Sequence, residues 1–149
     1  MKLYRFGKQP YIQDLTGQGG LYHGGRWHQK GTPILYAAEH LSLAKLEMLA
    51  NSPVLPTGYF ALTLEVPDTA SIKKVTANDL PSDWGAMPYL PTLAAITEAW
   101  IREGAHWLMR VPSAHSSAEY NYLFNPLHPD HAQLHVVSLE PHPFDARLK

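Results

Sequence analysis

The sequence predicts an α+β fold, and three observations support this class. Several short segments alternate apolar and polar residues with the two-residue period of a strand. Only two segments have helical spacing, and 13 prolines and 10 glycines are spread along the chain. A chain of 149 residues has the length of one ordinary domain and can bury a core without disulfides or metal. We therefore expect residues 1–149 to form a single compact domain of short elements joined by many turns.

The strand predictions depend on alternation and on turn residues at the segment ends. Apolar side chains occupy the even positions of residues 60–66, and Pro67 ends that segment. Further short runs bounded by Pro, Asn or Gly predict strands at 34–37, 106–111, 120–124 and 134–139. We expect these segments to form a sheet of five or six strands.

The two helical segments are 93–102 and 41–51. Apolar residues of the first recur at helical spacing, and Gly104 can supply its left-handed end. The second follows the 34–37 strand almost directly, and its apolar face is expected to consist of Leu43, Leu46 and Ala50. The Pro81–Pro91 stretch is expected to be a long loop, and the 74–91 region offers no pattern that indicates a role.

Composition excludes several classes of function. The 12 basic and 13 acidic residues give a formal charge of −1, without the basic excess that sequence-independent nucleic-acid binding needs. The absence of cysteine excludes a disulfide scaffold, thiol catalysis and a thiolate zinc site. No apolar run is long enough for a signal peptide or a membrane span, so we expect a cytoplasmic protein without membrane contact. Dinucleotide, phosphate-loop and Gly-x-Ser-x-Gly motifs are all lacking.

Glu47 is a carboxylate at the border of the apolar face of the 41–51 helix. No Lys or Arg stands three or four positions away on either side, so its partner must come from elsewhere in the fold, from water or from a ligand. Two interpretations stay open at this point. Glu47 is either an edge residue whose carboxylate reaches water, or a catalytic acid, base or electrostatic stabiliser.

The segment 19–28 combines glycines with a cation. Gly24 and Gly25 directly precede Arg26, and glycines let a backbone come close to a ligand while a guanidinium grips phosphate or carboxylate. This pattern suits an anion, although loop glycines also form turns and arginines also serve as surface charges.

Ser113 follows a predicted strand that ends near Pro112. A short hydroxyl at a sheet edge can orient a substrate or another side chain, and it can equally cap a turn.

The nine histidines suggest two further kinds of site. The spacing of His128, His131 and His135 suggests a metal site, but Pro129 disfavours a continuous ligand helix and no second cluster completes the site, so we expect no metal. Imidazoles titrate near neutral pH, so a metal-independent ribonuclease that uses two histidines, such as His23 and His28, stays open.

Four separated blocks, taken in order, closely resemble the RES-domain toxins. They are residues 25–38, 43–47, 112–113 and 121–128. The family is named for an Arg, a Glu and a Ser, which fall here on Arg26, Glu47 and Ser113. The resemblance extends over nearly the whole chain, with Ala50-Asn51 standing where the family often has Val-His.

This resemblance implies an NAD-consuming toxin of a bacterial type II toxin–antitoxin pair. It implies a fold similar to ADP-ribosyltransferases, in which a split, mixed β-sheet holds NAD in a cleft. The expected reaction is cleavage of the nicotinamide–ribose bond of NAD by hydrolysis or phosphorolysis, and the alternative is ADP-ribosyl transfer to a protein. The implied partner is an antitoxin with a helix-turn-helix DNA-binding domain, so nucleic acid would contact the partner and not this chain. A homodimer within the toxin–antitoxin complex is compatible with the resemblance.

On this hypothesis the site residues take separate roles. Glu47 stabilises positive charge on the ribose, Arg26 holds the diphosphate, and Ser113 orients Glu47 or the ribose. Tyr36 stacks on nicotinamide, and Trp27 belongs to the same NAD-binding surface. Two different functions stay open beside this one, namely a metal-independent ribonuclease and a non-catalytic binding module.

Overall fold

One seven-stranded sheet runs through the protein, and a computed structural model describes all of residues 1–149. The strands are β1 (Lys2–Lys8), β2 (Leu35–Ala38), β3 (Tyr59–Glu65), β4 (Ile72–Lys74), β5 (Leu108–Pro112), β6 (Tyr120–Phe124) and β7 (His135–Pro141). The α-helices are α1 (Gly19–Tyr22), α2 (Leu41–Ala50) and α3 (Pro91–Glu103). Short 3-10 helices occupy Tyr11–Gln13, Ala77–Asp79, Pro129–Gln133 and Ala146–Leu148. The α+β prediction is confirmed.

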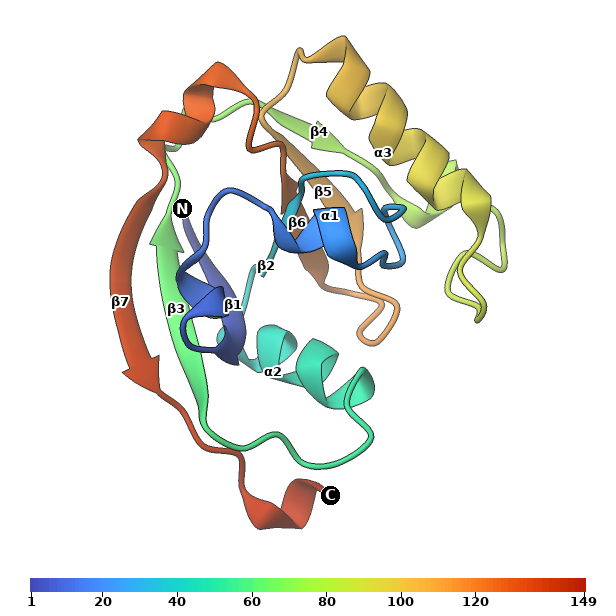
Figure 1. The fold of residues 1–149 in the computed structure, drawn as a ribbon. Helices are drawn as coiled ribbons and strands as arrows, with labels where there is room; N and C mark the ends of the chain where they lie inside the picture. Colours follow the sequence, from blue (N-terminus) through green and yellow to red (C-terminus); the bar gives the residue numbers. More distant parts are fainter.

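The sheet consists of two halves that meet at a narrow junction. Its strand order is β4-β5-β6-β2-β1-β3-β7, with β4 and β5 parallel and every other pair antiparallel. Strands β1 and β3 pair along their whole length, whereas β1 and β2 share the single pair Tyr4–Ala38. The half with β1, β3 and β7 therefore turns away from the half with β4, β5, β6 and β2 (Figure 1). This is the split, mixed sheet that the resemblance implies.

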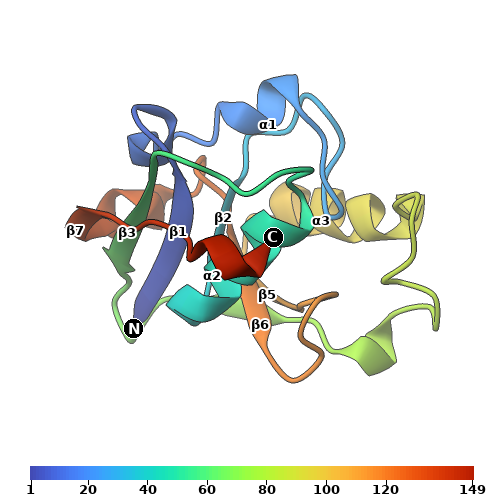
Figure 2. The same cartoon turned by 90° about the horizontal axis from the view of Figure 1, so that it is seen from below.

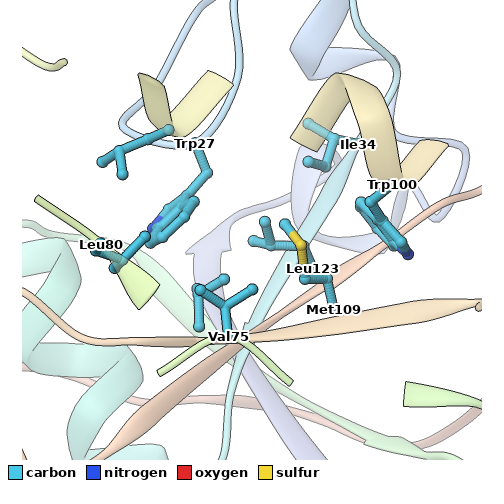
Figure 3. Packing of buried hydrophobic residues seen from close by; sticks show 9 residues of the cluster. Trp27, Ile34, Val75, Leu80, Trp100, Met109 and Leu123 are labelled. Atoms are coloured by element: carbon cyan, nitrogen blue, oxygen red, sulfur yellow. The ribbon is translucent and has the colours of Figure 1, made fainter. Parts of the chain in front are cut away.

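Helices α3 and α2 pack against different parts of the sheet. Helix α3 lies along β4 and β5 (Figure 1) and buries Leu93 and Trp100 in a cluster with Met109, Leu123 and the side chain of Trp27 (Figure 3). Helix α2 packs against the junction through a second cluster. That cluster consists of Phe6, Ala38, Leu43, Ala44 and Ala61.

The C-terminus lies near the end of α2 and the segment that follows it (Figures 1 and 2). The ammonium group of Lys149 donates to the backbone carbonyls of Leu49 and Ser52 at the end of that helix. A cation at a helix C-terminus is favourable because the last carbonyls have no partner within the helix. The end of the chain thus fastens the segment that follows α2.

Most predicted elements are confirmed with shifts of one or two residues, and the two helices lie where the spacing places them. Gly104 ends α3 in the left-handed conformation, with φ of 66°. The predicted loop is also confirmed, because residues 81–90 contain neither helix nor strand.

Two predictions are wrong. The sheet has seven strands and not five or six, because β1 and β4 carry lysines and an arginine that hide their strand pattern, and β4 is only three residues long. The buried face of α2 is Leu43 and Ala44, while Leu46 and Ala50 are exposed, because the helix rests on the sheet through the turn nearest the junction.

Glycine is required at position 20 of α1 for a steric reason. A Cβ there would stand 2.1 Å from the carbonyl oxygen of Thr32, whereas a Cβ at the adjacent Gly19 would meet nothing within 4 Å. Thus the 17–34 region closes on itself because the chain has no side chain at Gly20.

We expect Gly20→Ala to lower the free energy of unfolding by about 1–3 kcal/mol, because the backbone of Thr32 must move to admit the methyl group. The measurement is urea unfolding at equilibrium. Gly19→Ala is the matched control and should lose no stability. Equal stability of the two variants would contradict the close approach.

Candidate active site

A cavity of about 810 Å³ opens beside the junction of the two half-sheets. Its walls come from β1, the 11–28 segment, β2, α2 and the segment between β5 and β6. Its charged lining side chains are Arg5, Asp14, Arg26 and Glu47, and three histidines also reach it. A cavity that holds two arginines and two carboxylates suits a ligand with an anionic part and a centre that becomes positive.

Glu47 reaches this cavity from α2. Leu43 and Ala44 are buried against the junction, so the residue one turn further along the same face points along the sheet surface toward β6. Its Oε1 accepts hydrogen bonds from Ser113 Oγ and Asn121 Nδ2, each at 2.7 Å. Its Oε2 lies 3.6 Å from His115 Nε2. The carboxylate of this cavity-lining residue is thus held at Oε1, and Oε2 accepts no hydrogen bond from the protein.

Ser113 lies behind Glu47 and does not line the cavity, since it is 1% exposed. Its Oγ accepts from the backbone N–H groups of His115 (3.1 Å) and Ser116 (3.2 Å), which leaves its proton for Glu47. A hydroxyl has one proton and two lone pairs, so every hydrogen-bonding position of Ser113 is in use. The arrangement therefore lets Ser113 orient Glu47 and leaves it no free position for a ligand.

Arg26 stands at the tip of a tight turn in the cavity wall. Gly25 N–H donates to the carbonyl of His28 at 2.9 Å and closes the turn. The Nη1 group donates to the carbonyls of Trp84 (3.1 Å) and Ala86 (3.2 Å). Nε and Nη2 have no partner within the protein, so the outer edge of the guanidinium remains available to an anion.

The 81–90 loop forms a wall at Arg26. The ring of Tyr89 lies 4.9 Å from the guanidinium carbon of Arg26, and the rings of Trp84 and Trp27 are 6.3 Å apart. This role of the loop could not be predicted from the sequence, because the loop and the turn at residues 25–28 are about 60 residues apart in the chain.

Trp27 and Tyr36 are both found at the cavity, in different settings. Trp27 is 3% exposed and belongs to the core cluster, and it is also one of the residues that line the cavity. Tyr36 lines the cavity from β2, and its hydroxyl donates to His28 Nδ1 at 2.5 Å. His28 Nε2 donates to the carbonyl of His23 at 2.7 Å, which assigns Nδ1 as the acceptor. Burial raises the pKa of the Tyr36 hydroxyl well above its ordinary value.

Arg5 is a further cavity residue, and the sequence patterns did not select it. It lies on β1, and its Nη1 donates to the carbonyls of Ile12 (3.2 Å) and Asp14 (2.9 Å). Burial lowers the pKa of its guanidinium to about 10, partly offset by the Asp14 carboxylate, so it stays charged at neutral pH. The sequence offered no local signal for Arg5, because only the position of β1 between β2 and β3 shows that this arginine is buried.

The histidines singled out in the sequence do not gather into a metal centre or an acid–base pair. His131 Nδ1 accepts from Trp107 Nε1, and its Nε2 donates to the carbonyl of Leu15, so both nitrogens serve the fold. Both nitrogens of His28 are also occupied, and the residue is 7% exposed, which leaves it no free nitrogen for ribonuclease chemistry.

Another group could in principle hold a cation. The ligand atoms of Glu39, His40 and Glu119 lie within 4.8 Å of one another. Glu39 Oε1 already accepts from the backbone N–H of Tyr120, and Glu119 Oε2 accepts from Ser116 Oγ. None of the three lines the cavity.

Comparison with known proteins identifies the family. The model of the RES domain matches residues 2–146. The chain belongs to the RES domain family. It is 38% identical over 139 residues to Toxin Res of Pseudomonas putida, an alignment covering 91% of this chain and 92% of that protein. It is 34% identical to the Prs ADP-ribosylating toxin of a Sphingobium species, covering 91% of this chain and 86% of the relative.

A solved structure of the same fold belongs to a toxin–antitoxin complex. A chain of the M. tuberculosis MbcT–MbcA complex superposes with a TM-score of 0.76 at 17% identity, covering 95% of this RES chain and 84% of its own length. No α-helix of this RES chain combines the length and apolar character needed to cross a bilayer.

The burial of His28 makes stability depend on pH. Burial lowers the pKa of His28 below its ordinary value, partly offset by the carbonyl of His23. In the unfolded chain this imidazole takes up a proton near pH 6.5, before the folded state does, so the free energy of unfolding falls as the pH drops through that value.

We expect wild-type protein to lose more stability between pH 7.5 and 5.5 than His28→Gln, measured as the change in urea midpoint over that interval. His135→Gln, which alters an exposed histidine without side-chain partners, should keep the wild-type slope. A His28→Gln slope as steep as that of the wild type would refute the contribution of His28.

Proposed function

We propose that this RES protein is the NAD-consuming toxin of a type II toxin–antitoxin pair and cleaves the nicotinamide–ribose bond of NAD. The observation that carries this proposal is the Glu47 carboxylate, which is held by two hydrogen bonds at Oε1 and belongs to a residue lining the same cavity as two arginines. The family membership and the names of the toxin relatives agree with it.

The chemistry requires negative charge close to the ribose. When nicotinamide leaves as a neutral group, its carbon–nitrogen bond electrons go with it, and positive charge develops on the ribose. Glu47 Oε2 would stabilise that charge and accept a hydrogen bond from a ribose hydroxyl. Ser113 would act through Glu47 as a positioning residue.

The remaining cavity residues would bind the substrate. Arg26 would hold the diphosphate through Nε and Nη2, with the charge of Arg5 on β1 adding to the attraction. Tyr36 would stack on nicotinamide, its ring fixed by His28, while Trp27 would complete the wall. No metal ion takes part in this scheme, because Glu47 itself supplies the stabilising charge.

An antitoxin with a helix-turn-helix DNA-binding domain is the proposed partner, and the cytoplasm, where NAD is abundant, is the proposed location. The solved relative in a toxin–antitoxin complex supports a protein partner of this kind. A homodimer of this chain within such a complex belongs to the same proposal.

We expect Glu47→Gln to lower NAD turnover by at least about 100-fold, because the amide keeps the shape and removes the charge that the transition state needs. Nicotinamide release by the purified protein is the measurement. Glu98→Gln, an exposed residue of α3, is the matched control and should keep wild-type turnover. A folded Glu47→Gln protein with unchanged turnover would refute the role of Glu47.

Transfer to a protein is the second candidate activity, and the name of the Sphingobium relative favours it. Water, phosphate and a protein side chain all attack the same ribose carbon, so the products decide between them. Mass spectrometry should find ADP-ribose if water is the acceptor, and a phosphorylated ADP-ribose only in phosphate buffer if phosphate is. Label from adenine-labelled NAD in a cell extract would move into protein only if the chain is a transferase. Failure to release nicotinamide in all three conditions would refute both activities.

A further inference from the structure

The two oxygens of the Glu47 carboxylate have different surroundings. Oε1 accepts two hydrogen bonds at 2.7 Å, one from Ser113 and one from Asn121. Oε2 accepts none, and its nearest polar contact is His115 Nε2 at 3.6 Å. The two oxygens of a carboxylate are chemically equivalent, so the contacts at Oε1 define the plane of the group and leave the other oxygen position without a hydrogen-bond donor.

Ser113 alone does not define that orientation. A single hydrogen bond leaves the carboxylate free to turn about its last carbon–carbon bond, whereas two donors arriving from different directions at one oxygen fix its plane. Ser113 follows β5, and Asn121 stands on β6. The second donor is therefore the one that makes the orientation definite.

Asn121 is well placed to be a rigid support. Its backbone pairs with Ala38 on β2 and with Val111 on β5, so neighbouring strands hold it on both sides. In the same register Leu123 pairs with Tyr36, and side chains two positions apart on a strand share a face. Asn121 thus stands on the sheet face that carries Tyr36, and both residues line the cavity.

The chemistry of the donors also suits the proposed reaction. A hydroxyl and an amide donate hydrogen bonds without bringing positive charge, whereas an Arg or Lys partner would offset the negative charge that a ribose cation needs. His115 is the titratable group that faces Oε2. The lysine of the same helix, Lys45, contacts His142 and the rings of Phe6 and Phe144 instead.

We propose that Asn121 is a positioning residue for Glu47, whose amide holds Oε1 so that Oε2 is the oxygen presented to the ribose. This role rests on the proposed cleavage of NAD, and it falls outside the three residues for which the family is named. Asn121 does not touch the reacting atoms in this scheme; it acts through Glu47.

Two substitutions distinguish the hydrogen bond that Asn121 donates from the space that its side chain fills. Asn121→Leu keeps a similar volume without a donor, and kcat should fall about 10-fold or more with KM for NAD changed less than about threefold, since misplacement of a catalytic group costs rate more than binding. Asn121→Asp keeps the shape, and its carboxyl group donates to Oε1 only when protonated. The introduced carboxylate and that of Glu47 repel each other when both are charged, and a proton taken up in acid restores a donor between them.

The ratio of Asn121→Asp to wild-type kcat should therefore be low at pH 7.5 and rise at least about fivefold toward pH 5 as the introduced group gains a proton. Asn78→Asp, at an exposed position of the Ala77–Asp79 turn, should give a ratio near one at every pH. A pH-independent ratio for Asn121→Asp, or wild-type kcat in Asn121→Leu, would overturn the assignment.

A crystal structure of Asn121→Leu tests the positioning without activity. We expect the Glu47 carboxylate to turn away from its present plane, so that Oε1 no longer makes its bond to Ser113 Oγ in the wild-type geometry. An unchanged carboxylate would overturn the positioning role even if NAD cleavage is established. Wild-type protein that releases no nicotinamide would instead refute the proposed function, and the crystal structure would still decide whether Asn121 positions Glu47.

Discussion

The single backbone pair between Tyr4 and Ala38 is the constraint on which the site depends. Strands β1 and β3 are paired along seven positions, and β2 and β6 along four, but β1 and β2 separate after one. Residues of both strands then face a cavity where further pairing would have closed the sheet. Helix α2 connects β2 to β3 and therefore crosses from one half to the other, which brings Glu47 to the junction.

Local pattern was sufficient to predict most of the elements and to select Arg26, Glu47 and Ser113. Tyr36 and Trp27 were named through the hypothesis that the family resemblance implies, and the fold brings them to the same region. Arg26, Tyr36 and Glu47 line the cavity, and Ser113 supports Glu47 from behind. Glu47 was selected because it had no partner within its own helix. The partners are 66 and 74 positions away in the chain, which is why no local spacing could name them.

The site residues that the sequence did not reveal were missed for one physical reason, namely that their roles depend on how distant strands pair. Arg5 has the appearance of a solvated charge in a short basic strand, and only the burial of β1 between β2 and β3 turns it toward the cavity. Asn121 has the appearance of an ordinary strand residue until the register sets it opposite Ala38. Leu46 was predicted on the buried face of α2 and is exposed. Helical spacing gives the period of the apolar residues, but it does not say which side of the helix faces the sheet.

The 81–90 loop beside Arg26 can vary in sequence without losing its contact with the arginine. The guanidinium is anchored to the loop through two backbone carbonyls, at Trp84 and Ala86, and not through their side chains. Every amino acid supplies a carbonyl oxygen, so the anchor depends on the path of the loop and tolerates exchange of its residues. The side chains of residues 81–90 can thus change during evolution, and with them the surface offered to other molecules beside the cavity, while Arg26 keeps its position.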